Sequence, residues 1–128
     1  IRQGIQTEMG FNADGDPAYL VEAQYDVAWP RMLLVLRKLG FDVKDLDKSN
    51  GLLFVTYNGD QGSWWDGLFT SDSELLEKGD YRLKVAKAGA NRTSVTFMDN
   101  ESVPFEANQV SDLYSAFAEV MSEDNLDI

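Results

Sequence analysis

The sequence contains no cysteine and no histidine among its 128 residues. Their absence excludes disulfide bonds, thiol nucleophiles, zinc sites built from Cys and His, and triads with a histidine base within this chain. The sequence also lacks an apolar run long enough to form a membrane-spanning helix. We therefore expect a function that depends on none of these features and that needs no metal and no cofactor.

Basic residues are scarce as well. Eleven Lys and Arg stand against 22 Asp and Glu, which gives a formal net charge of −11. Such a chain repels phosphate backbones and anionic membrane surfaces, so we expect no nucleic-acid partner and no direct binding to a membrane. Two interpretations of the negative charge stay open: solubility alone, or electrostatic steering of a basic partner.

Apolar residues are present in the proportion of an ordinary folded domain. They make up 44% of the chain, and the aromatic residues comprise 3 Trp, 5 Tyr and 7 Phe. This length and composition predict one globular domain with its own core. The chain begins at Ile1 and shows no signal peptide, so any targeting segment is expected upstream.

The two ends of the chain lack the regular patterns of its middle. Residues 1–17 show no clean period, and we predict a linker or a loosely attached arm there. They contain four residues typical of turns: Gly4, Gly10, Gly15 and Pro17. Residues 122–128 are rich in acids and predict an acidic tail with frayed structure. The folded domain is expected over residues 18–121.

Two segments have the apolar spacing of amphipathic helices. The first is expected to begin at the N-cap Asp26 and to end at Gly40 in a left-handed conformation. Its apolar face comprises Trp29, Met32, Leu33, Leu36 and Leu39. The second is expected to begin at the N-cap Asn108. Its apolar face comprises Val110, Leu113, Tyr114, Phe117 and Met121.

Alternating apolar and polar residues predict strands between and before these helices. The strands are expected at residues 18–24, 41–45, 52–57, 79–86 and 93–97. Short turns, including Asn50-Gly51, join consecutive strands into hairpins. The order of elements therefore predicts an α+β fold, in which a curved antiparallel sheet packs against two main helices on one face.

Several segments, taken in this order and at this spacing, resemble the carboxy-terminal domain of the BamC lipoprotein family, also called NlpB or DapX. They are Trp29-Pro30 with the Leu-rich helix that follows, Leu39-Gly40-Phe41-Asp42-Val43, Val55-Thr56-Tyr57, residues 79–85, residues 91–99 and the final aromatic helix. The resemblance covers Tyr19 to Met121. It implies a helix-grip fold over residues 18–121.

The resemblance also implies a function. It indicates a non-catalytic binding or scaffolding domain of an accessory lipoprotein in the assembly and insertion of outer-membrane β-barrel proteins. The implied partners are the other subunits of the β-barrel assembly machinery. The implied location is the bacterial outer membrane, through a lipid anchor upstream of this chain, with the side of the membrane left open.

Two other classes of function remain as alternatives. A helix-grip domain can carry a small lipid-like ligand, which would require a closed apolar cavity. A hydrolase would need a pair of carboxylates in a cleft, and Asp66, Asp72 and Glu74 lie near aromatic residues. We expect no enzyme, because acidic loop residues are usually solvated. The acidic run 12–16 resembles part of a calcium loop, but position 12 counted from Asn12 is Ala23, so we predict a turn.

The segment from Asn58 to Lys78 has no sustained period but is rich in aromatic residues. Neighbouring side chains of an extended chain point in opposite directions, so one of the paired tryptophans can enter the core while the other stays exposed. Trp65 is spaced to pack with nearby apolar residues as a core plug, and Trp64 is the better candidate for a partner contact. The predicted partner-binding residues are Trp64, Trp65, Asp66 and Phe69.

Overall fold

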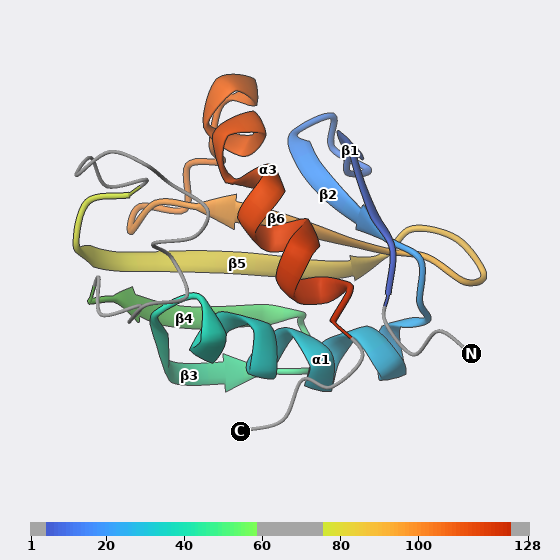
Figure 1. Ribbon diagram of the computed structural model, residues 1–128, viewed down its shortest axis with the longest axis horizontal. Helices are drawn as coiled ribbons and strands as arrows, with labels where there is room; N and C mark the ends of the chain where they lie inside the picture. Colours follow the sequence, from blue (N-terminus) through green and yellow to red (C-terminus); the bar gives the residue numbers. More distant parts are fainter. Residues whose placement is uncertain (1–4, 59–75, 124–128) are drawn as a thin grey trace.

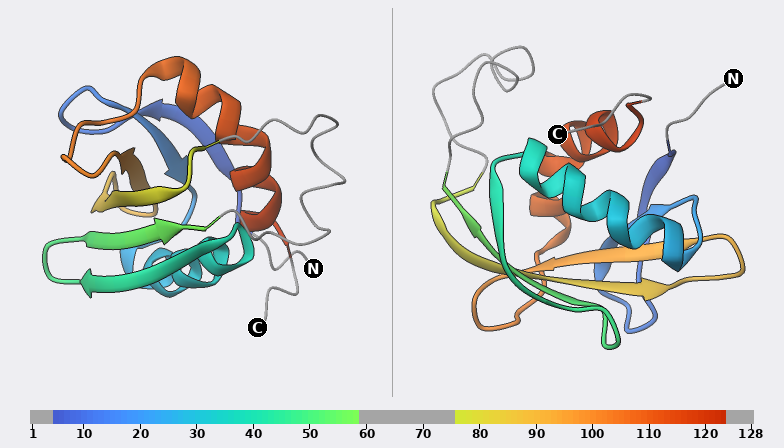
Figure 2. Two further views of the ribbon diagram at one scale, coloured as in Figure 1. Left: turned by 90° about the vertical axis from the view of Figure 1, so that its left-hand side faces the viewer. Right: turned by 90° about the horizontal axis from the view of Figure 1, so that it is seen from below.

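The computed structural model describes residues 5–58 and 76–123, and within them it has one antiparallel sheet and two helices (Figure 1). The strands are β1 (Thr7–Phe11), β2 (Pro17–Val21), β3 (Phe41–Asp47), β4 (Leu52–Tyr57), β5 (Gly79–Lys87) and β6 (Thr93–Met98). The helices are α1 (Tyr25–Lys38) and α3 (Ala107–Met121). The sheet order is β1-β2-β6-β5-β4-β3. Both helices lie on the same face of the curved sheet (Figure 2). The α+β prediction is confirmed.

The first strand was not predicted. We expected a linker or loose arm over residues 1–17, but Thr7–Phe11 pair with β2 in register, from Thr7 opposite Val21 to Phe11 opposite Pro17. The segment lacks an apolar alternation because it lies at the edge of the sheet and buries few side chains. Backbone pairing rather than side-chain burial therefore holds this strand.

Helix α1 presents its predicted apolar face to the sheet. Trp29, Met32 and Leu36 are buried, and Gly40 ends the helix region with a φ of 97°. The predicted cap at Asp26 is wrong by two residues. Gln24 is the N-cap, and its carbonyl accepts the backbone N–H groups of the residues three and four positions later. Asp26 instead lies in the first turn, where its negative charge interacts favourably with the positive end of the helix dipole.

Helix α3 packs its aromatic face across the middle of the sheet. Phe117 stacks on Tyr19 of β2 with ring centroids 4.5 Å apart, and the Tyr19 hydroxyl donates to the carbonyl of Val110 at 2.6 Å. The predicted cap at Asn108 is wrong. Glu106 is the N-cap, and it forms a reciprocal capping box with Gln109.

The carboxyl end of α3 is fixed to α1. The guanidinium group of Arg31 donates to the carbonyls of Met121 and Glu123, and Lys38 lies 3.9 Å from the Glu123 carboxylate. Of the predicted acidic tail, residues 122 and 123 are therefore attached to the fold, and residues 124–128 lie outside the described part. No described helix has both the length and the apolar character needed to cross a bilayer.

The hairpin between β3 and β4 depends on a glycine at its turn. Gly51 has a φ of 69°, and a β-carbon at this position would lie 2.0 Å from the carbonyl oxygen of Val85. The sequence predicted this turn from Asn50-Gly51, and the structure confirms it. The close approach of Gly51 to β5 is visible only in three dimensions, since the two residues lie far apart in the sequence.

Candidate functional site

The four residues predicted to bind a partner, Trp64, Trp65, Asp66 and Phe69, lie outside the described residues. The same holds for the loop carboxylates Asp72 and Glu74 that the hydrolase alternative requires. The two ends of the segment that contains them are described. Asn58 donates from its side chain to Asp42 at 2.9 Å, and Leu76 is buried in the core.

A surface cleft begins at Leu76 and continues along the turn that leads into α3. Its volume is about 430 Å³. It is lined by Leu76, Glu77, Tyr81, Asp99, Val103, Pro104, Phe105, Glu106 and Gln109. Leu76 is the first described residue after the predicted partner-binding segment, and the cleft that it lines is the candidate binding site.

The turn between β6 and α3 builds one wall of the cleft. One carboxylate oxygen of Asp99 accepts the backbone N–H groups of Glu101 and Val103, at 2.8 and 3.0 Å. Ser102 adopts a left-handed conformation with a φ of 66°. These bonds turn the chain back, so that the N–H of Phe105 donates to the carbonyl of Phe97 at 2.9 Å.

Aromatic rings form the floor of the cleft. The Phe105 ring stacks on Phe97 and makes an edge contact with Tyr81, with ring centroids 5.8 Å apart in both pairs. The Tyr81 hydroxyl donates to the carbonyl of Glu77 at 2.7 Å. The pKa of Tyr81 is raised, first by loss of solvation and then by the carboxylates of Glu77 and Asp99. The site therefore combines an aromatic floor with negative potential.

This chemistry favours binding of a cation or a basic segment. The lining residues include three acids, at positions 77, 99 and 106, and no Lys or Arg. Carboxylates and aromatic faces both attract ammonium and guanidinium groups. Sequence reasoning missed the site. One local signal for it is present: Phe105 follows Pro104 between a turn and a helix and belongs to neither the apolar alternation of the strand nor the apolar face of the helix.

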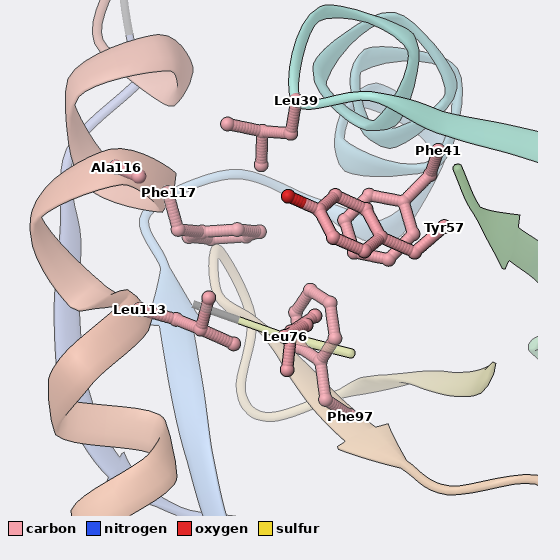
Figure 3. Close-up of a pocket in the computed structure, with 8 residues that line it drawn as sticks. All are labelled: Leu39, Phe41, Tyr57, Leu76, Phe97, Leu113, Ala116 and Phe117. Carbon is pink, nitrogen blue, oxygen red and sulfur yellow. The ribbon is translucent and has the colours of Figure 1, made fainter. Parts of the chain in front are cut away.

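The interior between helices and sheet is filled. An apolar cavity between them measures about 10 Å³, which is no larger than one water molecule requires. Figure 3 shows side chains from the end of α1, from the sheet, from α3 and from the chain before β5 converging on it. They are Leu39, Phe41, Tyr57, Leu76, Phe97, Leu113, Ala116 and Phe117. This cavity is far too small for a lipid, which a carrier would need to enclose.

The acidic run at residues 12–16 forms a turn, as predicted, and the Asn12 side chain holds it. The side-chain oxygen of Asn12 accepts the backbone N–H groups of Asp14 and Asp16, at 2.9 and 3.0 Å. Its amide nitrogen donates to Thr96 at 2.8 Å on the outer face of the sheet. Within residues 5–58 and 76–123, no group of three or more acidic side chains is placed to hold a metal ion.

A small α+β domain with a filled core and an acidic, aromatic cleft at its surface has the character of a binding module. Residues 7–121 match the family model described as "Outer membrane protein assembly factor BamC-like C-terminal domain". The chain belongs to this family, as its resemblance to the BamC lipoproteins predicted.

Full-length relatives agree with this assignment. A protein of Pseudoalteromonas atlantica named outer membrane protein assembly factor BamC is 55% identical, over 100% of this chain and 35% of its own length. A protein of the same name from Ferrimonas balearica is 40% identical, over 98% of this chain and 34% of its own. A third protein of this name, from Yersinia pestis, is 32% identical over 93% of this chain and 33% of its own length. The chain spans about a third of the length of these relatives.

Proposed function

We propose that this chain is a non-catalytic binding or scaffolding domain, of the helix-grip type, in an accessory lipoprotein of outer-membrane β-barrel assembly. The observation that carries the proposal is membership of the BamC-like family, in which the full-length relatives are named as assembly factors. The proposed partners are other subunits of the assembly machinery. The proposed location is the outer membrane, through a lipid anchor outside this chain.

The arrangement of the domain supports a role in binding rather than in ligand transport or catalysis. Its interior space of about 10 Å³ leaves no room for a lipid, whereas the cleft beside Leu76 has about 430 Å³ open to the surface. Neither histidine nor cysteine is available for catalysis. A partner that presents basic side chains would meet the carboxylates of Glu77 and Glu106 at the cleft.

The proposal is tested by affinity purification of the full-length lipoprotein that contains this chain from solubilised outer membranes. The expected result is copurification of barrel-assembly subunits, identified by mass spectrometry. Tyr81→Lys places a positive charge in the cleft and is expected to weaken a contact made there, while Leu46→Lys at an exposed site on β3 serves as the matched control. A full-length protein that copurifies with none of these subunits would contradict the proposal.

A second measurement addresses the carrier alternative. Native mass spectrometry of the purified domain is expected to show the mass of the chain alone. A bound lipid that persists through purification would favour the carrier.

A further inference from the structure

The two edges of the sheet differ in how they are protected. At one edge, β3 carries charges at positions 42, 44, 45 and 47 and has a bulge between Val43 and Asp45. Charges and bulges are the usual devices that prevent an edge strand from pairing with another chain. At the other edge, β1 has one charged residue, Glu8, and it has two exposed apolar residues, Met9 and Phe11. The β1 edge therefore has a single charge and no bulge in its pairing with β2.

The backbone of β1 offers free hydrogen-bonding groups at this edge. The residues on either side of β1 bond toward β2. The carbonyl of Gln6 accepts the N–H of Glu22, and the N–H of Asn12 donates to the carbonyl of Asp16, both at 2.9 Å. Antiparallel pairing alternates, so residues 8 and 10 also face β2, while residues 7, 9 and 11 direct their N–H and C=O groups outward. Only the outward groups are available to a further strand.

Helix α3 closes the first part of this edge but not the second. The N–H of Ile5 donates to the carbonyl of Met121 at 3.1 Å, and the carbonyl of Thr7 accepts from the Tyr114 hydroxyl at 2.8 Å. Beyond this point, the backbone groups of Met9 and Phe11 that face outward have no hydrogen bond to any residue in the described ranges.

An apolar groove lies beside the open part of the edge. Met9 and Phe11 stand opposite Tyr19 and Pro17, so their side chains lie on the helix face of the sheet, but they remain 47% and 66% exposed. The groove has a volume of about 290 Å³. Its lining is Met9, Gly10, Phe11, Pro17, Ala107, Val110 and Ser111. The first turns of α3 form its second wall.

We propose that this groove binds an extended, net-basic segment of another protein, which adds to the sheet as a strand beside β1. Free backbone donors and acceptors select an extended backbone, and an extended segment presents every second side chain to the same face. Apolar side chains at alternate positions would then enter the groove over Met9 and Phe11. The inference rests on the proposed binding function and gives it a surface and a partner chemistry.

Charge decides between a foreign segment and a second copy of this chain. Neither β1 nor α3 contains a Lys or an Arg, and Asp112 follows the groove residue Ser111, whereas the Glu8 carboxylate is paired with Arg92 at 3.3 Å. The chain as a whole carries −11, so two copies repel each other while a basic segment is attracted.

The test uses a short fluorescein-labelled peptide that alternates valine with lysine, followed by fluorescence anisotropy with the purified domain. Phe11→Lys places a like charge in the groove and removes an aromatic contact, and we expect binding to weaken about tenfold or more. Leu46→Lys replaces a similarly exposed apolar residue on the protected β3 edge and should leave binding unchanged. Circular dichroism and urea denaturation verify that both variants keep the fold.

A peptide of the same sequence, N-methylated at alternate amides, separates strand addition from general apolar adsorption. It keeps every side chain but loses the backbone donors, so it should bind at least about tenfold more weakly. Equal effects of Phe11→Lys and Leu46→Lys, undiminished binding of the methylated peptide, or no binding of the first peptide would each overturn the inference. Dimerisation in sedimentation that Phe11→Lys abolishes would overturn it in favour of a second copy. Copurification of the full-length protein with assembly subunits is a separate result, so the proposed function can stand when this inference fails.

Discussion

Truncation of Phe117 gives a direct measure of how α3 is attached to the sheet. The side chain is 1% exposed, stacks on Tyr19, and meets Phe97 edge-on at 6.0 Å between centroids. Replacing such a residue with alanine costs about 3–5 kcal/mol of unfolding free energy. We expect the upper half of this range for Phe117→Ala, because α3 is held at its start by the Glu106 capping box and at its end by Arg31, which limits collapse into the new cavity.

The magnitude is large relative to the total. A domain of this size has an unfolding free energy of about 5–15 kcal/mol, so the variant should lose roughly a third of it or more. With a slope near 2 kcal/mol per molar urea, a loss of 4 kcal/mol moves the denaturation midpoint by about 2 M. Urea titration followed by far-ultraviolet circular dichroism measures this shift directly.

The control and the refuting result come from the same titration. Ser115→Ala changes an exposed residue on the same helix and should alter the free energy by less than about 0.5 kcal/mol. A loss below about 1 kcal/mol for Phe117→Ala, at an unchanged slope, would mean that this ring does not hold the helix on the sheet.

Three further results are expected. Burial, and after it the Asp112 carboxylate, raises the pKa of Tyr19 above that of a free tyrosine. The folded state therefore favours the neutral phenol, and this contribution to stability is fully present below about pH 10. Above that pH the free energy of unfolding falls by up to about 1.4 kcal/mol per pH unit. Urea titrations from pH 9 to 11 should show that the unfolding free energy of Tyr19→Phe falls less with pH than that of the unchanged chain. An equal fall in both would argue against Tyr19 as the cause. Gly51→Ala should cost about 2 kcal/mol or more because its β-carbon meets the Val85 carbonyl, whereas Gly15→Ala, with open space around it, should cost about 1 kcal/mol. A chelator should leave the melting temperature unchanged, and a drop that calcium reverses would disprove the absence of a structural metal.

Those parts of the fold that bury a periodic face could be predicted from the sequence. The apolar face of α1, which includes Met32 and Leu36, follows from helical spacing in the sequence. The hairpin at Gly51 follows from the Asn-Gly pair between two alternating segments. Strand β1 escaped prediction because an edge strand is selected by backbone bonds to its neighbour, which the side chains of Thr7–Phe11 do not reveal.

The helix caps show a different limit. Asp26 and Asn108 are good capping residue types, but each helix has its N-cap two residues earlier, at Gln24 and Glu106. The side chain of Gln24 bonds to Asn91 at 3.1 Å, a partner 67 residues away. Glu106 and Gln109, by contrast, have the spacing of a capping box, but with Glu in the place where the sequence signature has Ser or Thr.

The candidate site could be predicted least well. The predicted binding residues at 64–69 lie outside the described part, so that hypothesis remains a prediction. The cleft at Phe105 and the groove at Phe11 each bring together elements distant in the chain. A pattern within one segment therefore cannot specify them.

The hydrogen bond from Ile5 to the carbonyl of Met121 has a topological consequence. The residues just before β1 and the last turn of α3 meet at one corner, and Arg31 fixes that corner to α1. The chain path of the domain is thus nearly a closed ring. Force applied through the flanking chain would load this one corner instead of being transmitted along the strands. A circular permutant that joins this corner and opens the ring at the β5–β6 turn would retain every strand pairing of the sheet.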